Sequence, residues 1–392
     1  MEKVTEKTWS KPVHAFIPWY EVDYQTQAQI RSVAELPFLA DFIAIMPDTH
    51  LGYGVPIGCI LKTSDHVIPN AVGVDIGCGV GFRIVPNIDS DLLKNKDFWL
   101  KYEAEVLKQV PVGFNWHNHA QGIQCDLGLR MPLDNEDEHR ARCQLGTLGG
   151  GNHFMEVQVN ANGAVVLMVH SGSRRLGGIV AKHYHDHAMT ESTGIPKDLA
   201  ALKLASELGQ NYIHDMNLVT KYAAQNRELM LAKMTDILYR LLREEDHPDT
   251  FDPKMKTTDR PHNYATAEYG ITTHWKGAMH LPIGTIGAIP GSMGSNTYIV
   301  KGVGNLDAHD STSHGAGRAM SRGQAKKNVS MEDFETSLAG TFSVPKESYL
   351  DESPAAYKSI DTVMERQSSL LEVISINRPL LTIKGSSSSR ED

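Results

Sequence analysis

Short apolar runs separated by glycine-rich segments fill much of the first half of the chain. Such runs cover residues 42–46 (FIAIM), 56–61 (PIGCIL), 81–85 (GFRIV) and 163–170 (GAVVLMVH). Each run is too short for a typical helix and is bounded by residues that favour turns, so the pattern predicts buried β-strands. We therefore expect a core built around β-sheet, with loops at the strand ends.

Residues 197–244 follow a different pattern, with apolar side chains at helical spacing and Lys, Glu and Arg between them. This periodicity predicts one long helix or a hairpin of two. Residues 245–262 are polar and contain Pro248, Pro253 and Pro261, so we expect a loop that returns the chain to the core.

The fold class predicted from these patterns is α/β (mixed α+β). We expect one large domain over residues 1–385, with central β-sheets, surrounding helices and a helical excursion at about 197–245. The last residues, 386–392 (SSSSRED), are expected to form a flexible tail because they offer no apolar surface to bury.

The composition fits a globular protein whose fold does not depend on disulfide bonds. A chain of 392 residues with 41% hydrophobic residues can bury a substantial core. No apolar run follows a basic N-terminal segment, and no run is long enough to span a bilayer, so a cytoplasmic location is expected. The four cysteines, Cys59, Cys78, Cys125 and Cys143, form no C-x-x-C pair, which favours free thiols or metal ligands over disulfides.

The charge balance argues against a protein that coats nucleic acid. The formal net charge is -9, whereas neutralising many phosphates requires clustered Lys and Arg. Any RNA contact must therefore be local. Candidate basic clusters, which could equally be solvated surface charge, are Arg174 with Arg175, Arg318 with Arg322, and Lys326 with Lys327.

The segment GVDIGCGVG, residues 73–81, contains Asp75 and Cys78 three positions apart. Its glycines permit the backbone conformations of a tight turn, so the carboxylate and the thiol can converge. A thiolate can bridge two borderline cations while the aspartate holds one. Taken alone, the pair fits a buried turn with an inert cysteine equally well.

Further glycine-flanked segments each supply a polar side chain with an affinity for metal or phosphate. Residues 146–156 (GTLGGGNHFME) present Asn152, His153 and Glu156, and His170 ends an apolar run in VHSGSR. His262 follows a proline, and His314 lies in STSHGAGR, whose glycines would let a phosphate approach the backbone. A single histidine is more often a packed core or surface residue, but this repeated setting favours an active site. The rival metal site is His183, His185 and His187, whose spacing on a helix would scatter the imidazoles.

Taken together, these motifs resemble those of the RtcB family of RNA-splicing ligases. The motifs, in chain order, are GVDIGCG, LGTLGGGNHFMEV, HSGSR, HNY, IPGSMG, SHGAGRAMSR and a terminal IKG. The resemblance extends from MPDTHLGYG, near residue 46, to Lys384. Several separately placed motifs in one order are far more specific than a single glycine pattern.

The resemblance implies two Mn²⁺ ions, with Zn²⁺ or Co²⁺ as possible substitutes, and GTP as co-substrate. The implied metal ligands are Asp75, Cys78, His153, His170 and His262. The implied nucleophile is His314, which would attack the α-phosphate of GTP and carry GMP. The implied nucleotide contacts are Asn152, His153, Phe154, Met155, Glu156, His262, Asn263, Pro290, Gly291, Ser292, Met293, Thr297, His314, Gly315, Ala316, Gly317 and Lys384.

The resemblance also implies the reaction. RNA with a 3′-phosphate or a 2′,3′-cyclic phosphate would be joined to RNA with a 5′-hydroxyl, in RNA repair or tRNA splicing. Glu156 can accept hydrogen bonds from guanine N1 and N2, and Lys384 can donate to O6, which favours GTP over ATP. Two alternatives are a metal-dependent cyclic phosphodiesterase or phosphatase that does not ligate, and a non-catalytic RNA-binding protein.

The chain departs from the family pattern at a few positions. Tyr53 replaces a lysine in HLGYG, His274 and Trp275 precede Lys276 where the family has R-K-G-A, and Thr312 replaces a cysteine. The first two changes remove positive charge near the presumed RNA path. They suggest a divergent paralogue, for which an activating protein is possible but unidentified.

Overall fold

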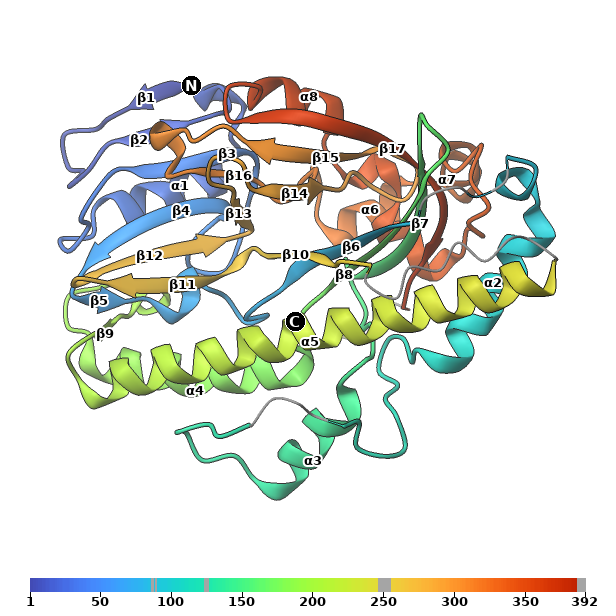
Figure 1. The fold of residues 1–392 in the computed structure, drawn as a ribbon. Coiled ribbons are helices and arrows are strands. Elements are labelled where there is room, and N and C mark those ends of the chain that lie inside the picture. Colours follow the sequence, from blue (N-terminus) through green and yellow to red (C-terminus); the bar gives the residue numbers. More distant parts are fainter. Residues whose placement is uncertain (86–87, 89, 123–126, 246–254, 386–392) are drawn as a thin grey trace.

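Two β-sheets and a long helix organise the molecule (Figure 1). The computed structural model describes residues 1–85, 88, 90–122, 127–245 and 255–385. The expected tail at 386–392, Cys125 and residues 246–254 of the expected loop lie outside the described residues. The mixed α/β class predicted from the sequence is confirmed.

Within the part of the chain that the structure describes, the first sheet has six strands. Its order is β1 (Glu2–Val4), β2 (Val13–Ala15), β3 (Ile43–His50), β4 (Ile57–Ser64), β12 (Ile271–Lys276) and β11 (Asn263–Glu268). Strands β2 and β3 are parallel, and the other neighbours in this sheet are antiparallel. Strand β3 bulges between Ile45 and His50. An irregularity of this kind re-aims side chains near a strand end.

The second sheet has seven strands, all antiparallel to their neighbours. Its order is β10 (Thr258–Pro261), β6 (Gly79–Val85), β8 (Val165–Ser171), β7 (Phe154–Asn160), β17 (Leu371–Ile383), β15 (Thr297–Gly302) and β14 (Ile286–Ile289). Two short pairs join β13 (Ala278–His280) to β16 (Ser311–Ser313) and β5 (His66–Val67) to β9 (Leu202–Lys203). The runs at 42–46, 56–61, 81–85 and 163–170 thus fall largely in β3, β4, β6 and β8, as predicted.

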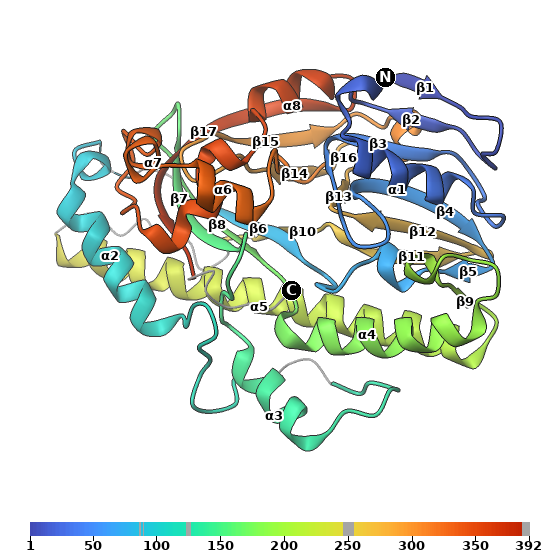
Figure 2. The same cartoon turned by 180° about the vertical axis from the view of Figure 1, so that it is seen from behind.

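The helices lie mainly around the sheets, as Figures 1 and 2 show from opposite sides. They are α1 (Tyr24–Ala34), α2 (Lys96–Gln109), α3 (Asn135–Gln144), α4 (Arg174–Glu191), α5 (Glu207–Glu244), α6 (Arg322–Asn328), α7 (Met331–Ser337) and α8 (Ile360–Arg366). Within the described residues, none of these helices has both the length and the apolar character needed to cross a membrane.

Helix α5 is the predicted helical excursion, and it is one continuous helix of 38 residues. Its first half buries Tyr212 and Val219 in a cluster shared with α4, and its second half buries Met230 and Leu238 against the second sheet. The helix therefore joins two cores and runs beneath both sheets (Figure 1). Apolar residues on one face of a helix favour burial of that face, which explains why the periodicity was visible in the sequence.

Two predicted boundaries were wrong. The helix does not begin at residue 197, because residues 202–203 pair with β5 and the Ser206 side chain caps α5 by accepting a hydrogen bond from Gly209 N. Residues 258–261 are not loop but strand β10, which pairs with β6. Polarity misled the second prediction, because Asp259 in β10 pairs with buried Arg227 of α5.

Candidate active site

Five polar side chains converge where strands β6, β7 and β8 meet the segment between β10 and β11. Cys78 directly precedes β6, His153 directly precedes β7, His170 lies in β8, and His262 separates β10 from β11. The registers Val80↔His170, Phe154↔His170 and Gly79↔Pro261 bring these positions together. Asp75 reaches the same point from the glycine-rich turn before Cys78.

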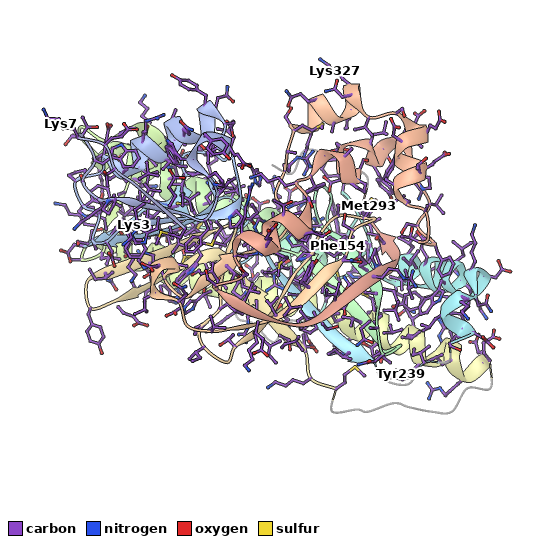
Figure 3. The ribbon with its side chains drawn as sticks, turned by 90° about the horizontal axis from the view of Figure 1, so that it is seen from above. Lys3, Lys7, Phe154, Tyr239, Met293 and Lys327 are labelled. Carbon is purple, nitrogen blue, oxygen red and sulfur yellow. The ribbon has the colours of Figure 1, made fainter. Side chains whose placement is uncertain are left out.

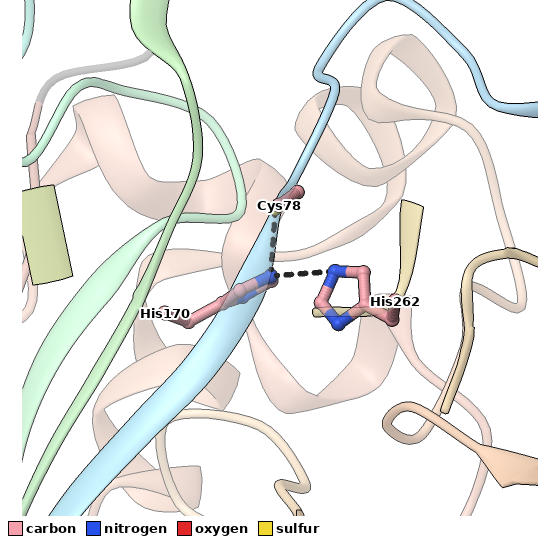
Figure 4. Close-up of side chains that lie close together, drawn as sticks. All are labelled: Cys78, His170 and His262. Carbon is pink, nitrogen blue, oxygen red and sulfur yellow. Dashed lines mark hydrogen bonds between the residues drawn. The ribbon is translucent and has the colours of Figure 1, made fainter. Parts of the chain in front are cut away.

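The ligating atoms of these residues form a compact cluster. Cys78 Sγ lies 3.3 Å from His170 Nε2 and 3.5 Å from His153 Nε2. His170 Nε2 lies 3.4 Å from His262 Nε2, and His153 Nε2 lies 3.0 Å from Asp75 Oδ2. Figure 4 shows Cys78, His170 and His262 facing one another. The atoms divide into two groups that could each hold a cation, Cys78–His170–His262 and Asp75–Cys78–His153, and the thiol belongs to both.

Contacts behind the cluster fix its orientation. His153 Nδ1 lies 3.2 Å from Leu148 O, a contact that holds the ring with Nε2 facing Asp75 and Cys78. Asp75 Oδ1 accepts hydrogen bonds from Ser173 N (2.9 Å) and Ser173 Oγ (3.2 Å). Buried Arg227 of α5 donates to the carbonyl oxygens of Gly77 and Ser171, both at 2.8 Å, and so ties the cysteine turn to the end of β8.

Burial and pairing set the protonation states in the cluster. Burial lowers the pKa of His170 and of His262 well below the ordinary value, so both imidazoles are neutral and can donate a lone pair. Burial alone would raise the pKa of Asp75, but hydrogen bonds and charge from His153 outweigh it, and the pKa lies below its ordinary range. Burial and neighbouring Asp75 raise the pKa of the Cys78 thiol, so binding of a cation must displace its proton.

His314 follows β16 and lies against the same cluster. Its ring centroid is 4.6 Å from that of His262. Its Nδ1 lies 2.8 Å from Asp48 Oδ2, and its backbone N donates to the same oxygen at 3.1 Å. Gly317, at φ +71°, packs on the carbonyl of Asp48 so closely that a Cβ would lie 2.1 Å from that oxygen. The bulged part of β3 therefore packs closely against the glycine-rich turn that follows His314.

The five residues of the cluster and His314 line one cavity of about 760 Å³. Its walls include nearly all of the predicted nucleotide contacts: Asn152, His153, Phe154, Glu156, His262, Asn263, Pro290, Gly291, Ser292, Met293, His314, Gly315, Ala316, Gly317 and Lys384. Figure 3 labels two of them, Phe154 and Met293. Met155 and Thr297 do not line the cavity: Met155 points into the hydrophobic core, and Thr297 Oγ1 accepts a hydrogen bond from Gln158 at 2.9 Å.

Two buried charged groups lie in the walls near Phe154. Glu156 Oε1 accepts from Gln158 Nε2 at 2.7 Å, and Oε2 accepts from Thr382 Oγ1 at 2.6 Å. Burial raises the pKa of Glu156 to about 7 despite these bonds. Lys384 Nζ lies 3.0 Å from Glu352 Oε2, and both side chains are buried. The carboxylate and the ammonium are thus held in position before any ligand binds.

The arginines predicted to contact RNA line the cavity but are also held from within the protein. Arg174 is buried and donates to Thr147 Oγ1 at 3.1 Å and to Gly113 O at 2.8 Å. Arg318 donates to Asp351 O at 2.7 Å. Their positive charge is therefore presented to the cavity from fixed points.

The rival histidine site does not assemble. All three histidines lie on α4, where the rings of His183 and His187 are tilted against each other with centroids 4.5 Å apart. His185 instead contacts Asn70, at 3.2 Å. Among the residues that the structure describes, neither group able to hold a metal includes any of these three histidines.

Two residues of the cavity region were missed by the sequence analysis, Asp48 and His50 in MPDTH. Neither is flanked by glycine, and both follow an apolar run, so the segment looks like an ordinary strand end. The bulge of β3 that brings Asp48 to His314 leaves no clear signal in the sequence. The polar pair after a buried run, next to GYG, was the one available hint.

Comparison with known proteins agrees with the site geometry. The family model described as "tRNA-splicing ligase RtcB" matches residues 29–130 and 129–385. The RNA-splicing ligase RtcB of Escherichia coli K12 is 33% identical over 417 residues, which cover 98% of each chain. The RNA-splicing ligase RtcB of Mycobacterium tuberculosis is 29% identical and covers 91% of this chain and 100% of its own. The tRNA-splicing ligase RtcB of Aeropyrum pernix is 29% identical over 87% of each chain.

Proposed function

This chain belongs to the RtcB family, and we propose on that basis that it is a GTP- and manganese-dependent RNA ligase. It would join RNA 3′-phosphate or 2′,3′-cyclic phosphate ends to 5′-hydroxyl ends through a guanylylated His314. The observation that carries the proposal is that His314 and the cluster of Asp75, Cys78, His153, His170 and His262 share one cavity, with imidazole rings of His314 and His262 4.6 Å apart.

The donor set of the cluster fits a pair of divalent transition metals. Cys78 belongs to both candidate groups, and the two groups otherwise contribute imidazoles and one carboxylate. A thiolate and imidazoles favour manganese, cobalt or zinc over magnesium, while the carboxylate Asp75 suits manganese. When bound, such ions would supply positive charge that stabilises the phosphoryl groups in the transition state.

His314 has the properties of a nucleophile. The Asp48 carboxylate accepts a hydrogen bond from the protonated Nδ1, which leaves the Nε2 lone pair free to attack the α-phosphate of GTP. Attack makes the imidazole cationic, and buried Asp48 stabilises that charge. The pKa of Asp48 supports this role: burial would raise it, but the hydrogen bond and charge of His314 keep it below the ordinary value.

The preference for GTP would come from Glu156 and Lys384. Ionised Glu156 can accept from guanine N1 and N2, a pair of donors that adenine does not present, and Lys384 can donate to O6. Both side chains line the cavity and are held by hydrogen bonds. A bound guanine would form further hydrogen bonds with these two buried side chains. Because both side chains are already held in place, binding of guanine rather than adenine would cost little conformational entropy.

The remaining steps would transfer GMP from His314 to the RNA 3′-phosphate and then seal the strand with release of GMP. RNA needs only a local cationic surface for this, which is compatible with the net charge of -9. Arg174, Arg318 and Arg322 line the cavity and could contact the phosphates near the junction.

The test is covalent labelling. Incubated with GTP labelled on the α-phosphate and Mn²⁺, the wild-type protein should acquire an acid-labile, base-stable label that His314→Ala lacks. RNA with 3′-phosphate and 5′-hydroxyl ends should then be joined. An unlabelled wild-type protein that opens cyclic phosphates would instead indicate a phosphodiesterase, and one that binds RNA without turnover would indicate a non-catalytic protein.

A further inference from the structure

One residue, Asp48, orients two imidazoles of the cavity region. Its carboxylate accepts from His314 Nδ1 at 2.8 Å, and its backbone carbonyl lies 3.0 Å from His50 Nδ1. His50 and His314 both line the cavity. The proposed chemistry assigns a role to His314 and none to His50.

The contact with Asp48 fixes the tautomer of His50. A carbonyl oxygen can only accept, so His50 Nδ1 carries the proton and Nε2 is an unprotonated lone pair. Nε2 has no hydrogen-bond partner among the described residues, and the side chain is partly exposed where it lines the cavity. Desolvation lowers the pKa of His50 to about 4, so the ring is neutral near pH 7.

The segment that carries His50 is rigid. Lys358 Nζ donates to Pro47 O at 3.1 Å and to Thr49 O at 2.5 Å, on either side of Asp48. Thr49 Oγ1 donates to Ile57 O at 2.8 Å. A general base must be held in a fixed position relative to the proton that it removes, and this anchoring fixes the backbone that carries His50.

The proposed steps divide according to whether the nucleophile carries a proton. His314 attacks GTP with a free lone pair, and an ionised RNA 3′-phosphate attacks the guanylylated histidine with an anionic oxygen, so neither needs a base. The 5′-hydroxyl that seals the strand must lose a proton. The sealing step therefore needs a proton acceptor, and none of the residues discussed so far has been given that role.

We propose that His50 Nε2 is the general base that takes the proton from the attacking 5′-hydroxyl in the sealing step. The hydroxyl oxygen forms a bond to the 3′-phosphorus, the bond from that phosphorus to the GMP oxygen breaks, and GMP leaves with the electron pair. The hydroxyl proton passes to His50 Nε2 and then to solvent. This inference rests on the proposed ligase function.

The experiment separates the first step from the last. His50→Asn retains a donor near the Nδ1 position but has no basic nitrogen, and His50→Gln offers an uncharged acceptor of similar length. Each variant is assayed with Mn²⁺ for His314 labelling by GTP, and for sealing of RNA whose 3′-phosphate already carries GMP. The control is His66→Asn, because His66 Nδ1 makes the same contact with a carbonyl two residues earlier (Ser64 O, 2.8 Å) but does not line the cavity.

General base catalysis typically contributes about 10²–10⁴-fold. We expect both His50 variants to lose at least about 100-fold in the sealing of guanylylated RNA, and at least tenfold more than they lose in His314 labelling. The His66→Asn control should keep both rates near wild type. Equal losses in the two assays would mean that His50 only supports His314, and sealing at the wild-type rate would also overturn the proposal. Failure of the wild-type protein to label His314 would instead refute the ligase function itself.

Discussion

The contact between Asp48 and His314 makes the most direct prediction about rate. In Asp48→Asn the carboxylate that accepts from His314 Nδ1 at 2.8 Å becomes a neutral amide. The side chain of Asp48 is fully buried and that of His314 is 13% exposed, so water cannot replace the lost charge. The amide can also turn its NH₂ group toward Nδ1, which would move the proton to Nε2 and block the attacking lone pair.

The magnitude follows from the kind of bond that is lost. A hydrogen bond to a charged group contributes about 1.5–3 kcal/mol. If this contribution is realised as His314 becomes cationic, guanylylation should slow by about 10- to 100-fold, since 1.36 kcal/mol corresponds to a factor of ten. The other oxygen, Asp48 Oδ1, has no hydrogen-bond partner among the described residues, so the His314 contact carries most of the effect.

The assay is single-turnover transfer of labelled GMP to the protein, with thermal unfolding measured in parallel. Asp307→Asn is a matched control, because Asp307 Oδ1 lies 3.5 Å from His14 Nδ1 in an aspartate–histidine pair away from the cavity. A correctly folded Asp48→Asn protein that labels at the wild-type rate would refute the reasoning.

Further predictions concern the base pocket, the metals and the support from α5. The pKa of Glu156 is raised to about 7 by burial, and only the ionised form accepts from guanine, so GTP affinity should rise about tenfold from pH 6 to pH 8 and level off above that. Equilibrium binding across this range tests it, and Glu156→Gln should abolish the pH dependence; a flat wild-type profile would contradict it. Cys78→Ala should lower bound Mn²⁺, measured by elemental analysis, together with His314 labelling, and full metal content in this variant would exclude a bridging thiolate. Asp259→Ala leaves buried Arg227 without its ion pair and should lower the free energy of unfolding by about 3 kcal/mol, whereas an unchanged denaturant midpoint would argue against it.

How far the sequence could predict the site depends on how each residue is presented. Cys78 and His314 are next to glycines and His153 closely follows a triple-glycine segment, so the local sequence marked all three. Asp48 and His50 are brought to the cavity by extra residues in β3 that break its register with β4. A bulge of this kind depends on long-range pairing, so local sequence does not reveal it.

Strand periodicity, used more strictly, would have shortened the list of predicted nucleotide contacts. Phe154 and Glu156 line the cavity, whereas Met155 between them points into the opposite core. This is the alternation that any strand imposes, so Met155 could have been excluded once residues 154–160 were assigned to β7. A contiguous motif marks a segment, but only alternate side chains of that segment can reach a ligand on one face of the sheet.

The chain is acidic, yet its proposed substrates are anions. The positions of the buried carboxylates near the cavity explain how both can hold. Glu352 is buried in the cavity wall and Asp351 is buried beside it, and Arg318, Arg322 and Lys384 form ion pairs of 2.5–3.3 Å with them. These two carboxylates therefore hold three cations in place. A wall of this kind presents positive charge at fixed points to a phosphate, while the net charge of -9 disfavours binding of nucleic acid to the chain as a whole. On this basis the net charge predicts selectivity for RNA ends over RNA in general, because a strand gains attraction only where its terminus can enter the cavity.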